Sequence, residues 1–499
     1  MACMHTAGLS TNVEELHQCI HAMGEEIRLL KEQLRLALRR QFGSQSEAFS
    51  PDQLSLLALS DVEVVITEAD KPVNESRPTP RATRQAVLVS KNTPVERIEL
   101  DVAQSDKTCD CCGGALHRIG EDCSYQVEFI PAQTKVIETA RPKYGCRHCE
   151  TGVKQQSLPP MLVPKSMASA SLLAYLMVSK YVDHLPLNRL EGILKRHGIT
   201  LPRSTQCDWL MRCAQHLKPL TQRMREQLLQ SPQIFTDDTI LPLQNDRKTH
   251  RQLIQARLWV YATQCKTGPP MILYDFTRTR EKCGPQTFLK GYRGYVQADA
   301  YSGYDGLYVA GAREVACMAH CRRYFFEASE NELTPGPAHQ ALSLISELYR
   351  IERTIKHYGH KKRKKQRRLQ AKPVLKRLRR WLQAQRAKHL PKGKFAKAVN
   401  YALNHWPALT RYCEAGYLEI DNNYSEREMK PIALGRKNYL FTGSERGGEA
   451  AAIFYSLVES AKANGLNVYA YLTDVLDRLP RTQESELDSL LPYRWQPTE

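Results

Sequence analysis

The sequence has no run of about 18 or more apolar residues, which is the length that a membrane-spanning helix needs. Residues 1–10 contain neither a basic cluster nor an apolar stretch, so we expect no secretory signal peptide. No repeat of fixed period is evident along the chain. Together these absences predict a cytoplasmic protein that makes no use of a membrane.

Acidic residues are fewer than basic residues. The chain of 499 residues contains 71 Lys and Arg against 53 Asp and Glu, which gives a formal net charge of +18. Such an excess attracts polyanions, and nucleic acid is the commonest large polyanion in a cytosol. The alternative is a basic surface without such a partner, and charge alone does not separate the two. The length predicts roughly two to four domains.

The 15 cysteines are an odd number in a chain without an export signal, so we expect no disulfide framework. Residues 99–155 contain two Cys-x-x-Cys pairs, and this spacing lets both thiolates of a pair face one tetrahedral zinc ion. Cys111 is an alternative ligand to its neighbour in the first pair. We therefore predict a module with structural Zn²⁺ over residues 99–155. The predicted ligands are Cys109, Cys112, Cys146 and Cys149.

Apolar residues recur at steps of three or four over residues 13–38. This seam is narrower than the apolar face of a globular helix. It favours a self-associating coiled coil within residues 1–45, and hence a homo-oligomer, over a single amphipathic helix on its own core. Residues 46–98 shift to Ser, Pro, Thr and charged residues, which predicts a linker.

Helical periodicity dominates residues 156–229. Leu187–Leu217 contains two helical stretches around a break at His197-Gly198. This pattern is typical of a helix-turn-helix, which would read DNA in a major groove. A plain helical hairpin has the same pattern, and the sequence does not separate the two.

Strand signals follow, and acidic residues stand at their ends. Cutting and rejoining a phosphodiester needs an activated oxygen nucleophile and neutralised phosphate charge, which two Mg²⁺ (or Mn²⁺) ions about 4 Å apart provide. A ribonuclease H-like core supplies carboxylates from a first strand, the end of a fourth strand and a later helix. Asp237 after Ile234-Phe235-Thr236, Asp299 after Gly294–Ala298, and Glu426 in a helix that begins near Asp421 have this order.

The chain becomes helical after Pro335. We expect an all-helical insert at about 335–416 within a catalytic domain of residues 230–480, and a C-terminal tail over 481–499. Lys361–Arg368 has seven basic residues in eight. It is interpreted either as a flexible loop that tracks DNA or as a solubilising surface run.

Several long motifs resemble the transposases of the insertion sequence 66 family. They are Ile234–Leu241, Gly291–Tyr304, Cys317–Tyr324, Asp421–Arg427, Pro431–Ser444 and Ser456–Leu476. The resemblance extends over nearly the whole chain and implies a DDE-type transposase, with Asp237, Asp299 and Glu426 as metal ligands. It also implies that accessory proteins from the same element take part. The chain departs from the family pattern at Asp238, where Glu is usual.

Further residues are candidates for supporting roles. Cys317 and His320 resemble a Cys-x-x-His pair near the active site of several DDE groups; Zn²⁺ with Cys321 as third ligand is one interpretation, and a core pair is the other. Basic residues near the acidic positions would contact DNA phosphates, or else form solvated faces. These candidate DNA-binding residues are Arg322, Arg323, Arg436 and Lys437.

The sequence thus predicts a multidomain α/β protein. Its RNase H-like catalytic core carries an all-helical insert and is preceded by a coiled-coil helix, a zinc-binding module and a helical DNA-binding segment. The predicted function is Mg²⁺-dependent cleavage and strand transfer at the ends of an insertion sequence, with terminal-repeat and target DNA as partners. The alternatives are a zinc-containing DNA-binding protein with a decayed catalytic fold, and an RNase H-like nuclease without strand transfer.

Overall fold

A computed structural model describes most of the chain beyond residue 152, together with two shorter pieces. The chain divides into two units, residues 58–136 and the remainder, and the fold below is that of residues 137–497 of the larger unit. The predicted coiled coil is described only at residues 23–24, and the linker and the four predicted zinc ligands lie outside the described residues. No helix in the described part is long and apolar enough to cross a membrane. The described residues are 23–24, 134–145, 153–244, 253–330, 336–388 and 393–497.

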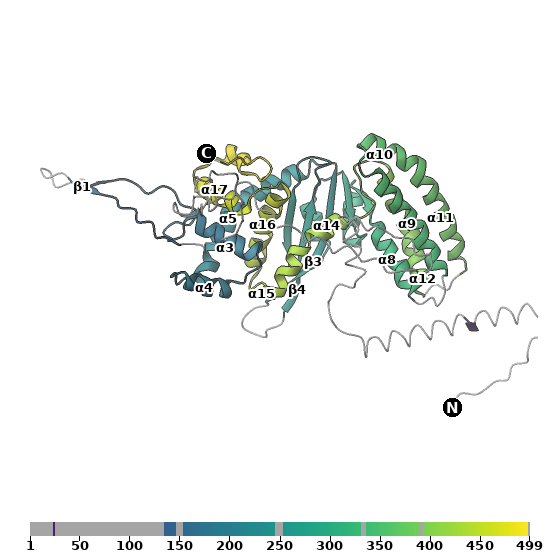
Figure 1. Ribbon diagram of the computed structural model, residues 1–499, viewed down its shortest axis with the longest axis horizontal. Coiled ribbons are helices and arrows are strands. Elements are labelled where there is room, and N and C mark those ends of the chain that lie inside the picture. Colours follow the sequence, from purple (N-terminus) through teal and green to yellow (C-terminus); the bar gives the residue numbers. More distant parts are fainter. Residues whose placement is uncertain are drawn as a thin grey trace, which may run out of the picture. The chain divides into compact units, whose positions relative to one another are not determined.

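A five-stranded mixed sheet forms the centre of this unit (Figure 1). Its strand order is β5-β4-β3-β6-β7. The β3–β4 and β4–β5 pairs are antiparallel, whereas β3–β6 and β6–β7 are parallel. The strands are β3 Gln233–Gln244, β4 Leu253–Ala262, β5 Ile272–Thr277, β6 Tyr295–Ala298 and β7 Arg313–Ala316. A separate antiparallel pair consists of β1 Lys143–Gly145 and β2 Val153–Gln155.

The central strand β3 is longer than the sequence pattern predicts. Its hydrogen-bonded register with β6 covers only Gln233 to Phe235, but its register with β4 continues to Gln244. Asp237 therefore lies within the strand, opposite Val260, and not after the strand as expected. The antiparallel partner keeps the backbone extended beyond the point where the parallel partner ends.

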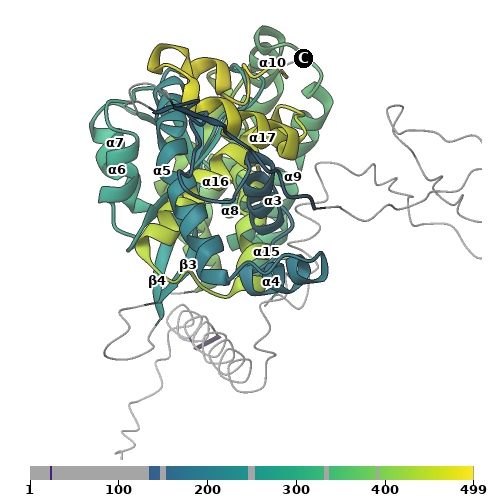
Figure 2. The same ribbon diagram turned by 90° about the vertical axis from the view of Figure 1, so that its left-hand side faces the viewer.

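Helices from both ends of the described chain cover one side of the sheet (Figures 1 and 2). The long helix α5 presents a buried stripe at helical spacing, including Leu210, Leu217, Met224 and Leu228. This stripe joins α3, α16 and the sheet in one apolar core. The helices on this side are α3 Ala170–Tyr181, α5 Arg203–Leu228, α16 Glu445–Ala463 and α17 Val468–Arg478, and α4 Leu187–Arg196 packs beside α5.

Helix α16 also covers the edge strand β5. Ser456 accepts a hydrogen bond from the amide of Tyr274 at 2.8 Å, and Ser460 both accepts from the amide of Ile272 and donates to its carbonyl. The two serines lie four residues apart, so they stand on one face of the helix. An uncovered edge would present unpaired backbone groups. These bonds fix the C-terminal segment against the sheet.

A second apolar core lies beyond β7, where α8 Met318–Ser329 packs with the all-helical segment that follows it (Figure 1). That segment contains α9 Pro337–Ile355, α10 His360–Gln366, α11 Lys372–Arg386, α12 Lys394–Asn404 and α13 Trp406–Thr410. The remaining helices are α6 Cys283–Phe288, α7 Asp305–Val309, α14 Asn423–Glu428 and α15 Lys430–Tyr439.

The basic run Lys361–Arg368 is not a flexible loop. It forms most of α10 and the first two residues of the short π-helix Arg367–Ala371 that leads into α11, and two of its arginines are buried. Arg367 donates to both carboxylate oxygens of Glu352 at 2.8 and 2.7 Å and to three backbone carbonyls. Arg363 donates to Glu352 and to Glu419. Burial without such partners would be costly for these charges, so the pairing decides which basic residues face inward.

We predict that Arg367→Met destabilises the protein strongly, because it leaves Glu352 short of a partner in a buried site and three carbonyls without a donor. Loss of one partner from a buried ion pair costs about 3–5 kcal/mol in the free energy of unfolding. The neighbouring exposed Arg368→Met is the matched control, with an expected change within about 0.5 kcal/mol. Urea denaturation followed by circular dichroism measures both, and equal midpoints would contradict the prediction.

Candidate active site

Two of the predicted carboxylates come from neighbouring parallel strands. Asp237 lies in β3, and Asp299 follows the last residue of β6. The register pairs Phe235 with Gln297, so its continuation by two residues brings Asp237 level with Asp299. Asp299 accepts a hydrogen bond at 3.1 Å from the amide of Tyr301. The end of β6 therefore places both carboxylates at one point of the sheet.

The third carboxylate, Glu426, belongs to the short helix α14. Asn422, just before this helix, donates from its side-chain amide to the carbonyl of Thr236 at 3.0 Å, and the Ser425 hydroxyl donates to the same oxygen at 3.5 Å. Thr236 is the residue next to Asp237. The carbonyl is free for these bonds because the β6 ladder has ended, so α14 attaches where the parallel pairing stops.

A buried glutamine in β6 holds the segment that precedes α14. Gln297 in β6 donates to the carbonyls of Glu419 and Asp421 at 2.8 and 2.6 Å, and its own oxygen accepts from Gln233 at 2.7 Å. The amide of Asn422 donates to the Cys317 sulfur at 3.1 Å. These bonds connect β3, β6, the start of α8 and the start of α14 through the buried residues Gln233, Gln297, Cys317 and Asn422.

The three carboxylates influence one another electrostatically. Burial raises the pKa of Asp237 well above its usual value, and the charges of Asp299 and Glu426 raise it further. The hydrogen bond from the amide of Asp238, at 2.8 Å, acts in the opposite direction. Burial also raises the pKa of Glu426, which Asp299 reinforces. Such clustering of like charges marks a site that is short of positive charge.

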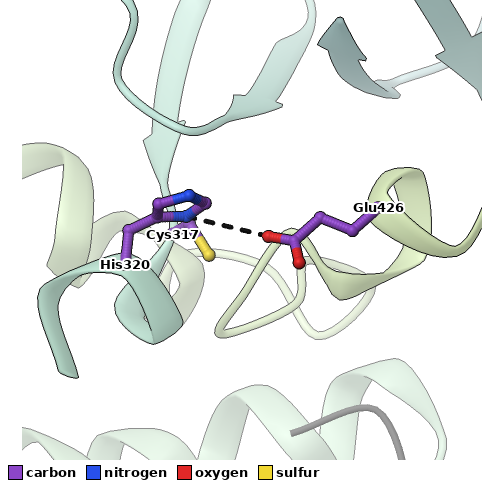
Figure 3. Close-up of side chains that lie close together, drawn as sticks. All are labelled: Cys317, His320 and Glu426. Atoms are coloured by element: carbon purple, nitrogen blue, oxygen red, sulfur yellow. Dashed lines mark ion pairs between the residues drawn. The ribbon is translucent and has the colours of Figure 1, made fainter. Parts of the chain in front are cut away.

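Glu426 points toward Cys317 and His320, which come from the beginning of α8 (Figure 3). One potential ligand atom of each of the three residues lies within 4.8 Å of the others, and no other such trio of His, Cys, Asp or Glu occurs in the described part of the chain. The His320 Nδ1 and Glu426 Oε1 atoms are 3.8 Å apart. Burial lowers the pKa of His320 to about 4, so the imidazole is neutral at pH 7 and the contact is not an ion pair there. Of the residues near Cys317 and His320, Glu426 and not Cys321 completes this trio.

Asp238, the departure from the family pattern, does not belong to the carboxylate cluster. Its side chain is 3% exposed and accepts from Arg257 at 3.0 Å and from Arg280 at 3.0 and 2.9 Å. Adjacent residues of a strand point to opposite faces, which separates Asp238 from Asp237. Arg280 also comes within 3.9 Å of Asp299 and lies over the ring of Tyr301. The Arg280 guanidinium thus lies between Asp238 and Asp299, a position that no sequence motif indicated.

The predicted DNA-binding cations have different surroundings. Arg323, half-buried on α8, is close enough that its charge lowers the pKa of Glu426 against the effect of burial. Arg322 lies over the ring of Phe326. Arg436 donates to the carbonyl of Ile240 and to Thr239, which ties α15 to β3, whereas Lys437 is exposed. The roles of all four in DNA binding stay predictions.

Fold and site together define a mixed α/β protein with acidic residues gathered at the centre of its sheet. Residues 165–450 match the model of the IS66 family of transposases, and this chain belongs to that family. Residues 106–150 match the zinc-finger binding domain of IS66 transposases, and residues 456–493 match the IS66 C-terminal element. Residues 29–98 match a model described as transposase C of IS166 homeodomain.

Full-length relatives occur in Sinorhizobium fredii. The uncharacterized protein y4jD is 34% identical over 98% of this chain and 98% of its own length. The uncharacterized protein y4hP is 32% identical over 93% of this chain and 87% of its own length, and y4qI is 31% identical over 98% and 93%. These relatives therefore align with nearly the whole length of the chain.

We predict that Asp237→Asn and Asp238→Asn shift thermal stability in opposite directions when no divalent ion is added. In Asp237→Asn the side-chain oxygen still accepts the hydrogen bond from the backbone amide of Asp238, and a repelled negative charge is removed. The melting temperature of this variant should therefore rise by about 2 °C or more. The amide at 238 leaves Arg257 and Arg280 without their anion, so its melting temperature falls. Differential scanning fluorimetry measures both, and a fall for both variants would refute a strained acidic cluster.

Proposed function

We propose that this protein is a DDE-type transposase that cuts DNA at the ends of an insertion sequence and joins the freed 3′ hydroxyl to target DNA. The observation that supports the proposal is that Asp237 on β3 and Asp299 after β6 lie level in the sheet, and that the charge of Glu426 on α14 also acts on Asp237. Membership of the IS66 family supplies the reaction class. Carboxylates that converge from separate elements are what two-metal phosphoryl transfer needs.

The sheet supports an RNase H-like core. Three antiparallel strands in the order β5-β4-β3 are extended by two parallel strands, β6 and β7. The first acidic residue lies on β3, the first strand of this sheet along the chain, the second follows β6, the fourth, and the third lies on a helix after the all-helical segment. This is the order in which an RNase H-like site places its carboxylates.

The residues fit divalent ions with oxygen ligands. Asp237, Asp299 and Glu426 would hold Mg²⁺ or Mn²⁺, since these hard ions prefer carboxylates. Burial and the charges of Asp299 and Glu426 raise the pKa of Asp237, and a bound cation would offset this repulsion. When bound, such ions neutralise charge on the phosphate and lower the pKa of the attacking water or hydroxyl.

The chain's own residues position and hold DNA in this proposal. Arg323 beside Glu426 and Arg280 beside Asp299 offer guanidinium groups at the rim of the cluster for phosphate oxygens. The exposed Lys437 extends this basic rim along α15. Tyr401 of the helical segment donates to the carbonyl of Asp299 at 3.3 Å and so fixes the end of β6.

The remaining parts are proposed to bring DNA to the site. The zinc-finger match supports structural Zn²⁺ in residues 106–150, for which the paired cysteines are the proposed ligands. This module, together with α4 and α5, would bind the terminal repeats. The N-terminal helix would join protomers into the synaptic homo-oligomer, in the cytoplasm, and accessory proteins of the same element would complete the complex.

We predict that Asp237→Asn, Asp299→Asn and Glu426→Gln each lower Mg²⁺-dependent cleavage and joining by a factor on the order of 10³, because several kcal/mol of metal-based stabilisation is lost. Glu428→Gln on the same helix is the control for Glu426→Gln. Burial raises the pKa of Glu428, to about 7, as it raises the pKa of Glu426, but Glu428 is not among the charges that act on Asp237. It should retain activity. The assay uses end-labelled duplexes with the termini of the element and a plasmid target.

The products separate this proposal from its rivals. Cleaved ends without joined products would instead define a nuclease, and binding without cleavage would define a DNA-binding protein with a decayed catalytic fold. Full activity in any of the three carboxamide variants would overturn the site assignment.

A further inference from the structure

The contact between Glu426 and the start of α8 forms a ligand set of its own. Cys317 immediately precedes α8 and His320 lies one turn later, so their side chains stand on the same side of the helix (Figure 3). Glu426 reaches this pair from α14. The sulfur, nitrogen and oxygen atoms lie within 4.8 Å of one another, and the nitrogen and oxygen are 3.8 Å apart.

These separations suit a tetrahedral ion. Zinc binds sulfur, nitrogen and oxygen at about 2.0–2.3 Å, so two of its ligands lie about 3.3–3.8 Å apart. The His320–Glu426 contact already has this spacing. At 3.8 Å the two atoms are too far apart for a hydrogen bond, and a single ion between them would use both.

The same atoms lack other partners. His320 Nδ1 and Glu426 Oε1 are both buried and accept or donate no hydrogen bond in the described structure. A buried polar atom without a partner is destabilising, which marks a place where a ligand is missing. The Cys317 sulfur, by contrast, receives the amide of Asn422 at 3.1 Å. Donors of this kind support a metal-bound thiolate from outside the ligand shell.

The chemistry of the set differs from that of the carboxylate cluster. Thiolate and imidazole select zinc and related ions, whereas Mg²⁺ takes oxygen ligands. Glu426 belongs to both sets, since its carboxylate also acts on Asp237. One carboxylate oriented toward α8 cannot serve at the same time as a full ligand beside β3.

We propose that Cys317, His320 and Glu426 bind one zinc-class ion, and that this ion inhibits the enzyme by withdrawing Glu426 from the cluster with Asp237 and Asp299. Binding of the ion stands on the geometry at α8 alone. Inhibition rests on the proposed transposase function. Cys321, one turn further along α8 and fully buried in the helical core, is not a ligand.

The binding experiment is a Co²⁺ titration of the full-length protein, with its zinc module loaded beforehand. We expect the wild type to bind one Co²⁺ more than Cys317→Ser, with a sulfur-to-cobalt charge-transfer band in the near ultraviolet that this variant lacks. His320→Gln, at a less buried position, should bind Co²⁺ at least tenfold more weakly. Cys321→Ser is the matched control and should keep the band. Equal binding by wild type and Cys317→Ser, or loss of the band in Cys321→Ser, would overturn the site.

The inhibition experiment titrates Zn²⁺ into the cleavage reaction at fixed Mg²⁺, each variant being compared with its own zinc-free rate. We expect Cys317→Ser and His320→Gln to need at least tenfold more Zn²⁺ for half-inhibition than the wild type and Cys321→Ser. Higher Mg²⁺ should raise the half-inhibiting Zn²⁺ concentration of the wild type. Equal sensitivity of all four proteins would overturn the inhibitory role. Absence of cleavage in every zinc-free reaction would refute the proposed function instead, and the Co²⁺ result would still stand.

Discussion

The proposed site has to hold three carboxylates near one another against their mutual repulsion. Burial and the charges of Asp299 and Glu426 raise the pKa of Asp237, so the metal-free cluster is electrostatically unfavourable. Rigid backbone has to impose it. The parallel β3–β6 ladder aligns the two aspartates, and Asn422 anchors α14 to the Thr236 carbonyl at the point where that ladder ends. Glu426 is thus positioned by a helix that attaches where the β3–β6 pairing ends.

The helical segment after α8 contacts the backbone and side chains that position the carboxylates. Glu419, a few residues before α14, is ion-paired with Arg363 in the segment and with Lys266 after β4. Tyr401 bonds the backbone of Asp299 from the same segment. A change in the position of these helices would therefore reach two of the three carboxylates. The buried pairing of Arg367 keeps the segment in one arrangement.

The sequence predicts the strands and the order of the acidic residues well, because buried strands and their flanking turns are local patterns. The predicted strand Gly294–Ala298, for example, contains β6. Local patterns of this kind do not show which distant residues come into contact in the fold. Charge and spacing could not tell that two arginines of Lys361–Arg368 turn inward, or that Asp238 pairs with Arg280 across the sheet. They also gave no sign that Glu426 lies near Cys317 and His320, because the two parts of the chain come together only after the chain returns from the helical segment.

The central claim is that the three carboxylates jointly hold divalent metal. Its most direct test is a crystal structure of the full-length protein with Mn²⁺, in which anomalous scattering locates the ions. The account predicts manganese at about 2.1 Å from oxygens of Asp237, Asp299 and Glu426, with Glu426 turned toward β3. Manganese bound elsewhere, with these carboxylates still separate at saturating metal, would contradict it.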